Sequence, residues 1–282
     1  MSRLLAFTLS AAVAVTAAAP ARAELAEWLA GELSVSTGFD FRTGDYTDEV
    51  RSDLWYVPFS VGYTFDDFGL TSYPSDLIEL RITVPLLHVR GPGSILTERG
   101  FVATPPGSGR DSRGGLGDIV VRGSYVLFPP PESGLPAFEL TGRAKIPTAS
   151  KREALGTGEP AYTLQLDLFD RYGPVTPLVS VGYRFVVPSE GFDLNNSWFT
   201  SVGAGFRVAD PLVIGMLYDF WQATSATGAD AHELFPYASW RIAPKLLVGP
   251  YAVICLSPGS PDWGVGLQLT YRIPIRCNIA GC

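Results

Sequence analysis

The sequence predicts an all-β protein, a transmembrane antiparallel up-and-down β-barrel of about twelve strands in a bacterial outer membrane. Three observations predict this class: apolar residues alternate with polar ones, long connections alternate with short ones, and few residues are charged. Charged residues make up 17% of the 282-residue chain and hydrophobic residues 46%. Globular chains carry about 25% charged residues. Much of the protein's surface is therefore expected to face something other than water.

The N-terminus predicts export from the cytoplasm. A short positive segment, Met1–Arg3, precedes the weakly polar or apolar stretch Leu4–Ala19 and the small-residue site Ala21–Ala23, as in a cleaved secretory signal peptide. A membrane-spanning helix needs about 20 apolar residues, more than this stretch supplies. We expect residues 1–23 to be removed as a signal peptide. Residues 24–282 are then expected to form a single outer-membrane barrel domain with a short periplasmic tail.

Period-two alternation recurs along the rest of the chain. In the last segment every odd position from Trp263 to Ile273 is apolar, and the even positions between them are polar or small. A helix would repeat apolar residues every three or four positions, so this alternation indicates a strand. Twelve segments show the pattern to varying degrees, at residues 33–42, 55–65, 78–84, 118–127, 138–146, 162–168, 179–185, 198–207, 212–221, 233–242, 246–254 and 262–273.

The connections between these segments predict a membrane barrel. Long or polar connections follow the odd-numbered strands, at residues 43–52, 88–114, 149–160, 187–195, 222–231 and 257–261. Tight turns follow most even-numbered strands, at residues 171–174, 209–211 and 243–245, with 66–76 as the exception. Outer-membrane barrels have long outer loops and short periplasmic turns. Both chain ends are then expected in the periplasm.

Aromatic residues on the apolar faces favour a bilayer over a soluble β-sandwich. Two groups fall near the two ends of the strands, as in the aromatic girdles at membrane interfaces. The outer group is Phe41, Trp55, Tyr162, Phe185, Trp198, Phe220 and Trp263, and the inner group is Tyr63, Phe65, Phe138, Phe206, Trp240 and Tyr271. Aromatic residues also favour strands in general, which leaves a soluble β-protein as the alternative.

The polar faces would line the barrel interior, and their charges nearly balance. Nine basic residues face inward: Arg42, Arg81, Arg122, Arg143, Lys145, Arg184, Arg207, Arg241 and Arg272. Eight acidic residues accompany them: Asp40, Glu79, Asp118, Glu139, Asp167, Asp219, Glu233 and Asp262. Opposite charges on adjacent strands could pair and brace the interior. Twelve strands enclose more room than the eight that side chains can fill, which favours a narrow polar path.

Several inward residues are candidates for contact with a passing solute. Phe199, Trp221, Phe235 and Tyr237 interrupt the polar pattern on three adjacent strands near the outer mouth. Their rings could bind an apolar or aromatic solute, or they could support a loop folded into the mouth. The basic residues expected along the same path are Arg143, Lys145, Arg184, Arg207 and Arg241.

Other partners and cofactors are not indicated. The formal net charge is −7, whereas a nucleic-acid partner requires a concentrated basic face. The chain holds only two histidines, and its three cysteines, Cys255, Cys277 and Cys282, lack zinc-site spacing. Cys277 and Cys282 could form a tail disulfide. We expect no cofactor and no metal; the expected partners are outer-membrane lipids, a small-molecule solute and the barrel-assembly machinery.

Three short motifs carry a family resemblance. They are Gly115-Leu116-Gly117-Asp118 opening a strand, Lys145-Ile146-Pro147-Thr148 ending the next, and Leu155-Gly156-Thr157-Gly158 in the following loop. Their order resembles the outer-membrane barrel family named for the MetA pathway of phenol degradation. The resemblance implies a transporter-like protein for small, hydrophobic or aromatic compounds, with a porin-like role in the Gram-negative cell envelope.

Two other function classes remain open at this point. A barrel of structural or adhesion type would carry no solute. An outer-membrane lipid hydrolase would need a serine and a base within hydrogen-bond reach at the rim, where His88 and His232 are expected. The residues around neither histidine resemble a barrel-hydrolase motif. We therefore predict a non-enzymatic channel for passive uptake.

Overall fold

The computed structural model describes residues 31–45, 51–66, 76–91, 94–97, 100–102, 112–190, 194–225 and 228–275. The expected signal peptide, residues 1–23, and the expected tail disulfide between Cys277 and Cys282 lie outside these residues. The elements are β1 (Gly31–Gly44), β2 (Ser52–Asp66), β3 (Leu77–Arg90), β4 (Ser94–Thr97), β5 (Gly100–Val102), β6 (Ser112–Leu116), β7 (Ile119–Leu127), η1 (Pro131–Ser133), β8 (Ala137–Ile146), β9 (Ala161–Phe169), β10 (Val175–Val186), β11 (Ser197–Ala209), β12 (Leu212–Trp221), β13 (Ala231–Ala243), β14 (Leu246–Cys255) and β15 (Trp263–Ile275).

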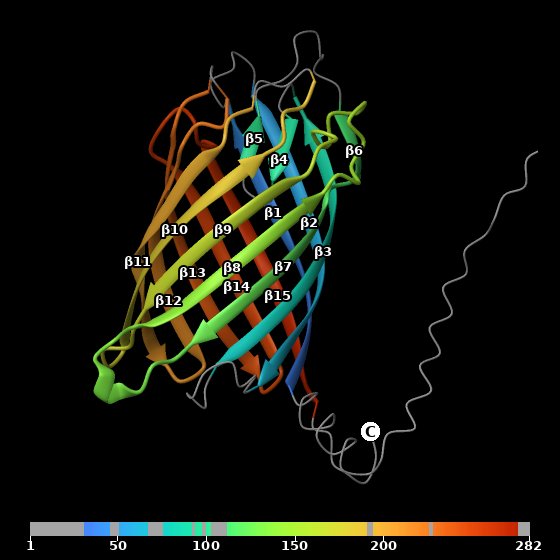
Figure 1. Cartoon of the computed structure of the whole chain (residues 1–282). Helices are drawn as coiled ribbons and strands as arrows, with labels where there is room; N and C mark the ends of the chain where they lie inside the picture. The colour runs from blue at the N-terminus through green and yellow to red at the C-terminus, as the bar shows by residue number, and fades with distance from the viewer. Residues whose placement is uncertain are drawn as a thin grey trace, which may run out of the picture.

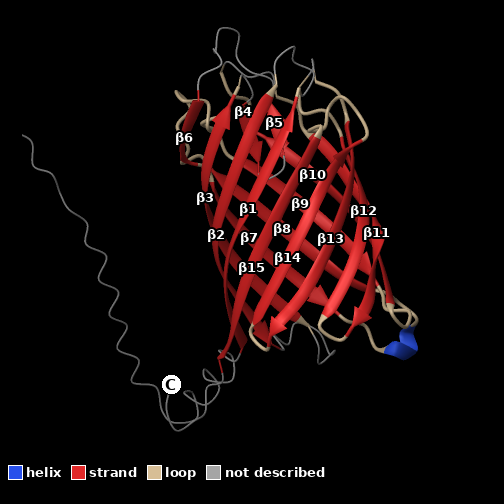
Figure 2. Ribbon diagram, turned by 180° about the vertical axis from the view of Figure 1, so that it is seen from behind, coloured by secondary structure: helices blue, strands red, loops and turns tan. Residues whose placement is uncertain are grey.

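Backbone pairing closes the long strands into a barrel. Each wall strand pairs antiparallel with its neighbours, and β15 returns to pair with β1, from Gly31 opposite Ile275 to Thr43 opposite Trp263. Strands β6 and β7 both pair with β3 and together form one interrupted wall strand. The wall is therefore a twelve-stranded antiparallel barrel, which confirms the predicted fold class. Figures 1 and 2 show its tilted strands from opposite sides.

The two ends of the barrel differ in their connections. The start of β1 and the end of β15 lie at the lower end in Figure 1. The tight turns β9–β10, β11–β12 and β13–β14 lie at the same end, where Gly173 adopts a φ of 61° that favours glycine. The longer connections β8–β9, β10–β11 and β14–β15 lie at the opposite end. We call the end with the tight turns the inner end and the other the outer end.

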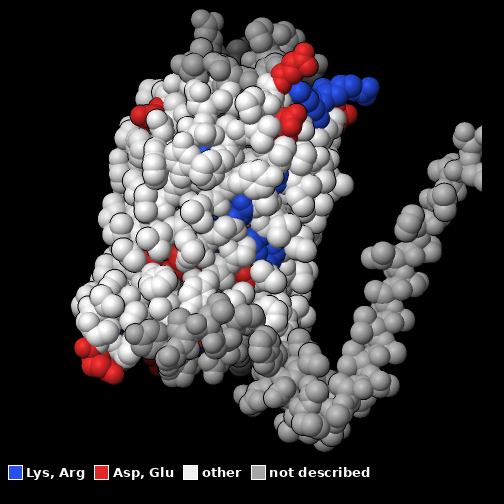
Figure 3. Space-filling model, in the orientation of Figure 1, with Lys and Arg blue, Asp and Glu red and all other residues white. Residues whose placement is uncertain are grey.

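Burial along the strands is inverted relative to a water-soluble protein. Val61, Leu80 and Ile82 are more than half exposed, whereas Ser180 and Thr141 face the interior and are almost completely buried. Figure 3 shows a mostly uncharged wall with a group of charged side chains at the outer rim. This arrangement follows from period-two alternation when one face meets lipid and the other meets the lumen. Among the described residues no helix is long and apolar enough to span a membrane.

Aromatic rings at the outer ends of the strands contact one another. Phe41 lies 5.1 Å from Trp55 and 5.4 Å from Trp263, measured between ring centroids. Tyr183 lies 4.6 Å from Trp198 in an edge-on arrangement. These contacts join neighbouring strands on the outward face. They place a band of amphipathic rings where a headgroup region would meet the barrel.

The predicted boundaries around the long connection 88–114 are corrected by the structure. Strand β3 continues to Arg90, and β6 extends the next wall strand back to Ser112. The motif at Gly117–Asp118 therefore interrupts a wall strand instead of opening it. The alternation is hidden here because Leu87 and Val89 face inward yet are apolar. Within the same connection β4 and β5 form a separate hairpin.

The lipid-facing wall gives a prediction about stability. Val181 lies midway along β10 and Val208 near the inner end of β11, and both are exposed on the outward face. Val181→Arg should lower the free energy of unfolding by about 2–4 kcal/mol, and the control Val208→Arg by about 0–1 kcal/mol, because the cost of a charge depends on its depth. Reversible unfolding in denaturant with phospholipid vesicles measures both. Equal losses at the two sites would contradict a membrane-embedded wall.

Candidate functional site

A cavity of about 440 Å³ lies inside the barrel. Its lining comes from strands around the circumference: Gly38, Phe39, Asp40, Arg42, Tyr56, Pro58, Ser60, Arg81, Thr83, Val120, Arg122, Arg143, Lys145, Ala161, Thr163, Gln165, Asp167, Leu178, Ser180, Arg184, Phe199, Ser201, Leu217, Trp221, Tyr251, Leu267 and Gln268. Its volume falls within the 300–1,000 Å³ typical of ligand pockets. The inward face of the strands therefore leaves room for a small solute.

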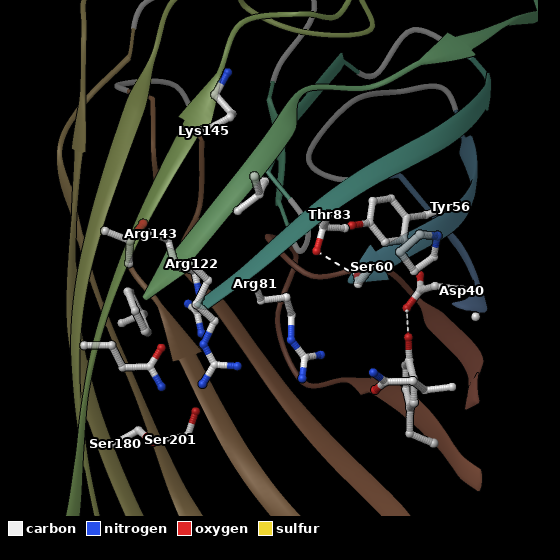
Figure 4. Close-up of a pocket in the computed structure, with 18 of the residues that line it drawn as sticks. Asp40, Tyr56, Ser60, Arg81, Thr83, Arg122, Arg143, Lys145, Ser180 and Ser201 are labelled. Carbon is white, nitrogen blue, oxygen red and sulfur yellow. Dashed lines mark hydrogen bonds between the residues drawn. The ribbon is translucent and has the colours of Figure 1, made fainter. Parts of the chain in front are cut away.

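Four arginines form a row along the cavity wall, which we call the arginine row. Arg81 on β3 is directly opposite Arg122 on β7, and Arg122 is opposite Arg143 on β8. Thr163 on β9 then lies opposite both Arg143 and Arg184. Figure 4 shows the first three of these side chains entering the same space from neighbouring strands. All four arginines line the cavity.

Carboxylates pair with part of the arginine row from its inner side. Arg81 donates from Nε and Nη2 to Glu79, at 2.8 and 2.5 Å. Arg122 donates from Nη2 to Glu139. The paired side chains Arg81 and Arg122 remain 21% and 27% exposed. Within the described part of the chain, Nε of Arg122 is buried without a hydrogen-bond partner. The partial exposure of Arg81 and Arg122 leaves their guanidinium groups within reach of the cavity.

The two carboxylates that line the cavity are already occupied by donors. Asp40 accepts from Arg42, at 2.9 and 3.2 Å, and from the hydroxyl of Tyr251 at 2.5 Å. Asp167 accepts from the amide of Gln165, at 2.8 and 3.0 Å, and from the hydroxyl of Ser180. The charged side chains of the lining therefore offer a solute hydrogen-bond donors more readily than acceptors.

A stacked aromatic pair forms the cavity wall beside the arginine row. The rings of Phe199 and Trp221 lie 4.5 Å apart with an interplanar angle of 14°. The guanidinium of Arg184 lies 5.3 Å from the centre of the Trp221 ring, in reach of a cation–π interaction. Gly182, opposite Phe199 on β10, is required here because a Cβ would overlap the Phe199 ring.

The other two predicted aromatic residues lie behind the lining. Phe235 is buried and stacks on Tyr251 at 4.9 Å, and Tyr237 lies opposite Tyr251 in the sheet. A Cβ on Gly215 would collide with the Tyr237 ring, so this glycine makes room for it. Neither Phe235 nor Tyr237 lines the cavity, whereas Tyr251 does. They therefore support a lining residue from behind.

The predicted basic residues are divided between two levels of the barrel. Arg143, Lys145 and Arg184 line the cavity. Arg207 and Arg241 lie outside its lining, near the inner ends of β11 and β13. Their backbone amides donate to the carbonyls of turn residues Pro174 and Pro211, respectively. They lie close to the inner turns and away from the arginine row.

The three family-like motifs converge at the outer mouth. The Nζ of Lys145 donates to Asp118 at 2.6 Å and to Thr157 at 3.1 Å. Asp118 also accepts from the amide of Ala149 at 2.9 Å, and the Thr148 hydroxyl donates to the Gly117 carbonyl at 3.1 Å. Lys145, Asp118 and Thr157 are all buried. This mouth cluster ties the β8–β9 loop to the start of β7 and the end of β8.

Apolar contacts hold the same loop against the inside of the wall. Leu155 is 2% exposed and belongs to one buried cluster with Ala149, Leu54, Leu87 and Val89, against which Tyr56 packs. Because Tyr56 also lines the cavity, the loop reaches the cavity's edge. Part of the outer mouth is thus covered by the β8–β9 loop.

The rim histidines occupy different settings. Ser112 Oγ lies 2.9 Å from Nε2 of His88, on the exposed outer part of the wall. His232 hydrogen bonds through Nδ1 to the Tyr218 hydroxyl at 2.6 Å. Among the described residues, no hydrogen bond or ion pair joins His88 to a carboxylate. The described residues also contain no group of His, Cys, Asp or Glu arranged to hold a metal ion.

The sequence patterns placed Arg81 and Arg122 on the inward face without marking them as site residues. Their importance comes from the register that sets them opposite Arg143. Tyr56 and Tyr251 were also not marked, because both look like ordinary strand aromatics in the sequence. If the strand register had been deduced from the tight turns, it would have predicted that these residues lie close together.

A closed barrel with a polar cavity and an aromatic wall defines an outer-membrane barrel of channel-like construction. The model of the family described as "putative MetA-pathway of phenol degradation" matches residues 74–273. The chain belongs to this family, which confirms the resemblance in the three motifs. A comparison with curated protein sequences finds no match.

Solved structures show the same architecture. An outer membrane channel from Pseudomonas putida F1 is similar, with a TM-score of 0.66, 13% identity, and 87% of this chain and 96% of that chain covered. The transport unit of the autotransporter AIDA-I from Escherichia coli gives a TM-score of 0.51 at 8% identity, with coverages of 87% and 90%.

The mouth cluster gives a second prediction. Asp118→Ala leaves the charge of Lys145 buried without its carboxylate. Removing one partner of a buried ion pair destabilises the folded arrangement by about 3–5 kcal/mol. The open population of the β8–β9 loop should rise about a hundred- to a few thousandfold. Trypsin cleavage after the exposed residues Lys151 and Arg152 should accelerate accordingly. Glu153→Ala, on the same loop, serves as control, and an unchanged rate for Asp118→Ala would exclude this role for the pair.

Proposed function

We propose that the barrel is an outer-membrane channel for passive uptake of small solutes, aromatic and hydrophobic compounds among them. The observation that carries the proposal is the polar cavity inside a closed wall, with a stacked aromatic pair on one side. Family membership and the likeness in fold to an outer membrane channel support the same class. In this proposal residues 1–23 are a cleaved signal peptide, and residues 24–282 are delivered to the outer membrane by the barrel-assembly machinery.

The aromatic pair gives the proposal a chemical basis. A solute ring that lies against Trp221 gains apolar contact and a favourable ring–ring geometry, while its polar groups keep hydrogen bonds to the lining. The lining provides these hydrogen-bond partners through the side chains of Ser201, Thr163 and Gln165. A path of this kind exchanges the hydration of the solute for contacts with the lining.

Trp221→Ala tests the aromatic part of the path. The swelling rate of proteoliposomes in phenyl glucoside, relative to that in glucose, should fall about two- to tenfold, the range expected for loss of one aromatic contact. Phe220→Ala is the matched control, because Phe220 is the adjacent residue of β12 and faces outward. A ratio unaffected by Trp221→Ala would exclude ring recognition there. Absence of swelling in both sugars would favour a structural or adhesion barrel.

A second candidate function has one observation in its favour. The Ser112–His88 hydrogen bond places a base within reach of a hydroxyl at the rim, as nucleophilic catalysis requires. The channel proposal predicts that the purified protein and its Ser112→Ala variant hydrolyse phospholipid at the same background rate. Ser133→Ala, at the inner end, controls for a general effect of losing a hydroxyl. Hydrolysis that Ser112→Ala abolishes would establish the rim enzyme.

A further inference from the structure

We propose that the cavity selects small aromatic carboxylates, which bind through the carboxylate to the arginine row and through the ring to the Phe199–Trp221 pair. This inference rests on the channel function proposed above and assigns the chemical class of its solute. The shared site is the arginine row, Arg81, Arg122, Arg143 and Arg184, together with the aromatic wall at its outer end.

The first support is the register of the row. Like charges directly opposite each other on neighbouring strands repel, and residues so placed have Cβ atoms about 4.5–5.5 Å apart. Arg81, Arg122 and Arg143 occupy three consecutive positions of this kind. Glu79 and Glu139 offset part of this repulsion by pairing with Arg81 and Arg122, and an anion between the guanidinium groups relieves more of it. Arginine also suits carboxylates specifically, because its planar fork donates two parallel hydrogen bonds to the two carboxylate oxygens.

The second support is how the lumen charges are sorted. The sequence count of nine basic and eight acidic residues suggests a neutral interior, but the register places many of the two signs in separate rows, which meet where Glu139 pairs with Arg122. Glu139 lies opposite Asp167, and Asp219 lies opposite Glu233, with Ser180 and Ser201 between these pairs in the same row. This acidic row runs from β8 to β13, and on β8 it lies on the inner side of Arg143. A solute anion therefore meets the arginine row on the outer side of these carboxylates.

The third support is the state of the lining carboxylates. Asp40 and Asp167 are each held by two donor side chains, which lowers their repulsion of an anion in the cavity. The other lining cations, Arg42 and Lys145, are paired at 2.9 and 2.6 Å and are almost fully buried. Arg81 and Arg122 are more exposed than either of these. Arg143 is half-buried, and Arg184, at 4% exposure, is as buried as Arg42. The basic side chains most accessible from the cavity are thus Arg81, Arg122 and Arg143 of the arginine row.

The Phe199–Trp221 pair then determines which group the solute carries beside its carboxylate. Arg184 ends the row and lies over Trp221, so a carboxylate near Arg143 or Arg184 places an attached ring beside the stacked pair. The wall and the row face one cavity of about 440 Å³, which suits a single-ring acid. A fatty acid would use the row without the rings, and a neutral aromatic would use the rings without the row.

Single-channel current in planar bilayers separates these cases. Benzoate, benzamide and acetate are added to the refolded protein, and the concentration of each that interrupts the current is measured. Benzamide has the shape of benzoate without its charge, and acetate has the charge without the ring. We expect benzoate to act at about a tenfold lower concentration than either, since each control lacks one set of contacts.

The paired substitution Arg122→Gln with Arg143→Gln should remove the advantage of benzoate over benzamide. Arg272→Gln, which changes an inward-facing arginine near the inner end, should preserve it. Heat-dependent gel mobility confirms that each variant is folded, and Arg122→Lys provides a milder second variant with an intermediate loss. The inference is overturned if benzoate and benzamide interrupt the current of the parent protein at the same concentration. It is also overturned if the advantage of benzoate survives the paired substitution. In both cases the channel function stands. A parent barrel without current overturns both.

Discussion

The requirement that every backbone amide and carbonyl be paired inside a bilayer is the constraint on which the rest of this structure depends. An open sheet in hydrocarbon would leave two edges unpaired, at several kcal/mol for each group. The seam between β1 and β15, from Gly31–Ile275 to Thr43–Trp263, removes those edges. Once the wall is closed, alternation assigns one side chain in two to lipid and the next to an enclosed lumen. The low charged fraction of the chain follows directly from this division.

The lumen that closure creates is organised by register. The same pairing that satisfies the backbone brings Arg81, Arg122 and Arg143 into one line and sorts acidic residues into another. It also sets Gly182 under the ring of Phe199, where a side chain could not fit. The family motifs act at the mouth, where Lys145, Asp118 and Thr157 hold a loop against Leu87 and Val89 through Leu155. Wall, cavity and mouth thus all depend on the same strand register.

Sequence patterns could predict the barrel and its inward face because lipid and lumen impose period-two alternation directly on the residues. They could not predict depth or register, which depend on where each turn begins. Arg207 and Arg241 have the right face but lie near the inner turns, and Phe235 and Tyr237 lie behind Tyr251. The alternation also ends early at β3, because its inward residues there pack on a loop from elsewhere in the chain. Long-range packing of this kind leaves no periodic signal.

In the proposed channel, the inward face of the strands borders a path open to solutes. Ser201 lines the cavity and Val202, the next residue of β11, faces outward and is half exposed. Each is replaced by cysteine in a protein whose three native cysteines are serine, and a charged, membrane-impermeant thiol reagent is added during current recording. We expect the reagent to modify Ser201→Cys with a lasting fall in current and to leave Val202→Cys unmodified. A current that persists unchanged at Ser201→Cys while Val202→Cys reacts would contradict it.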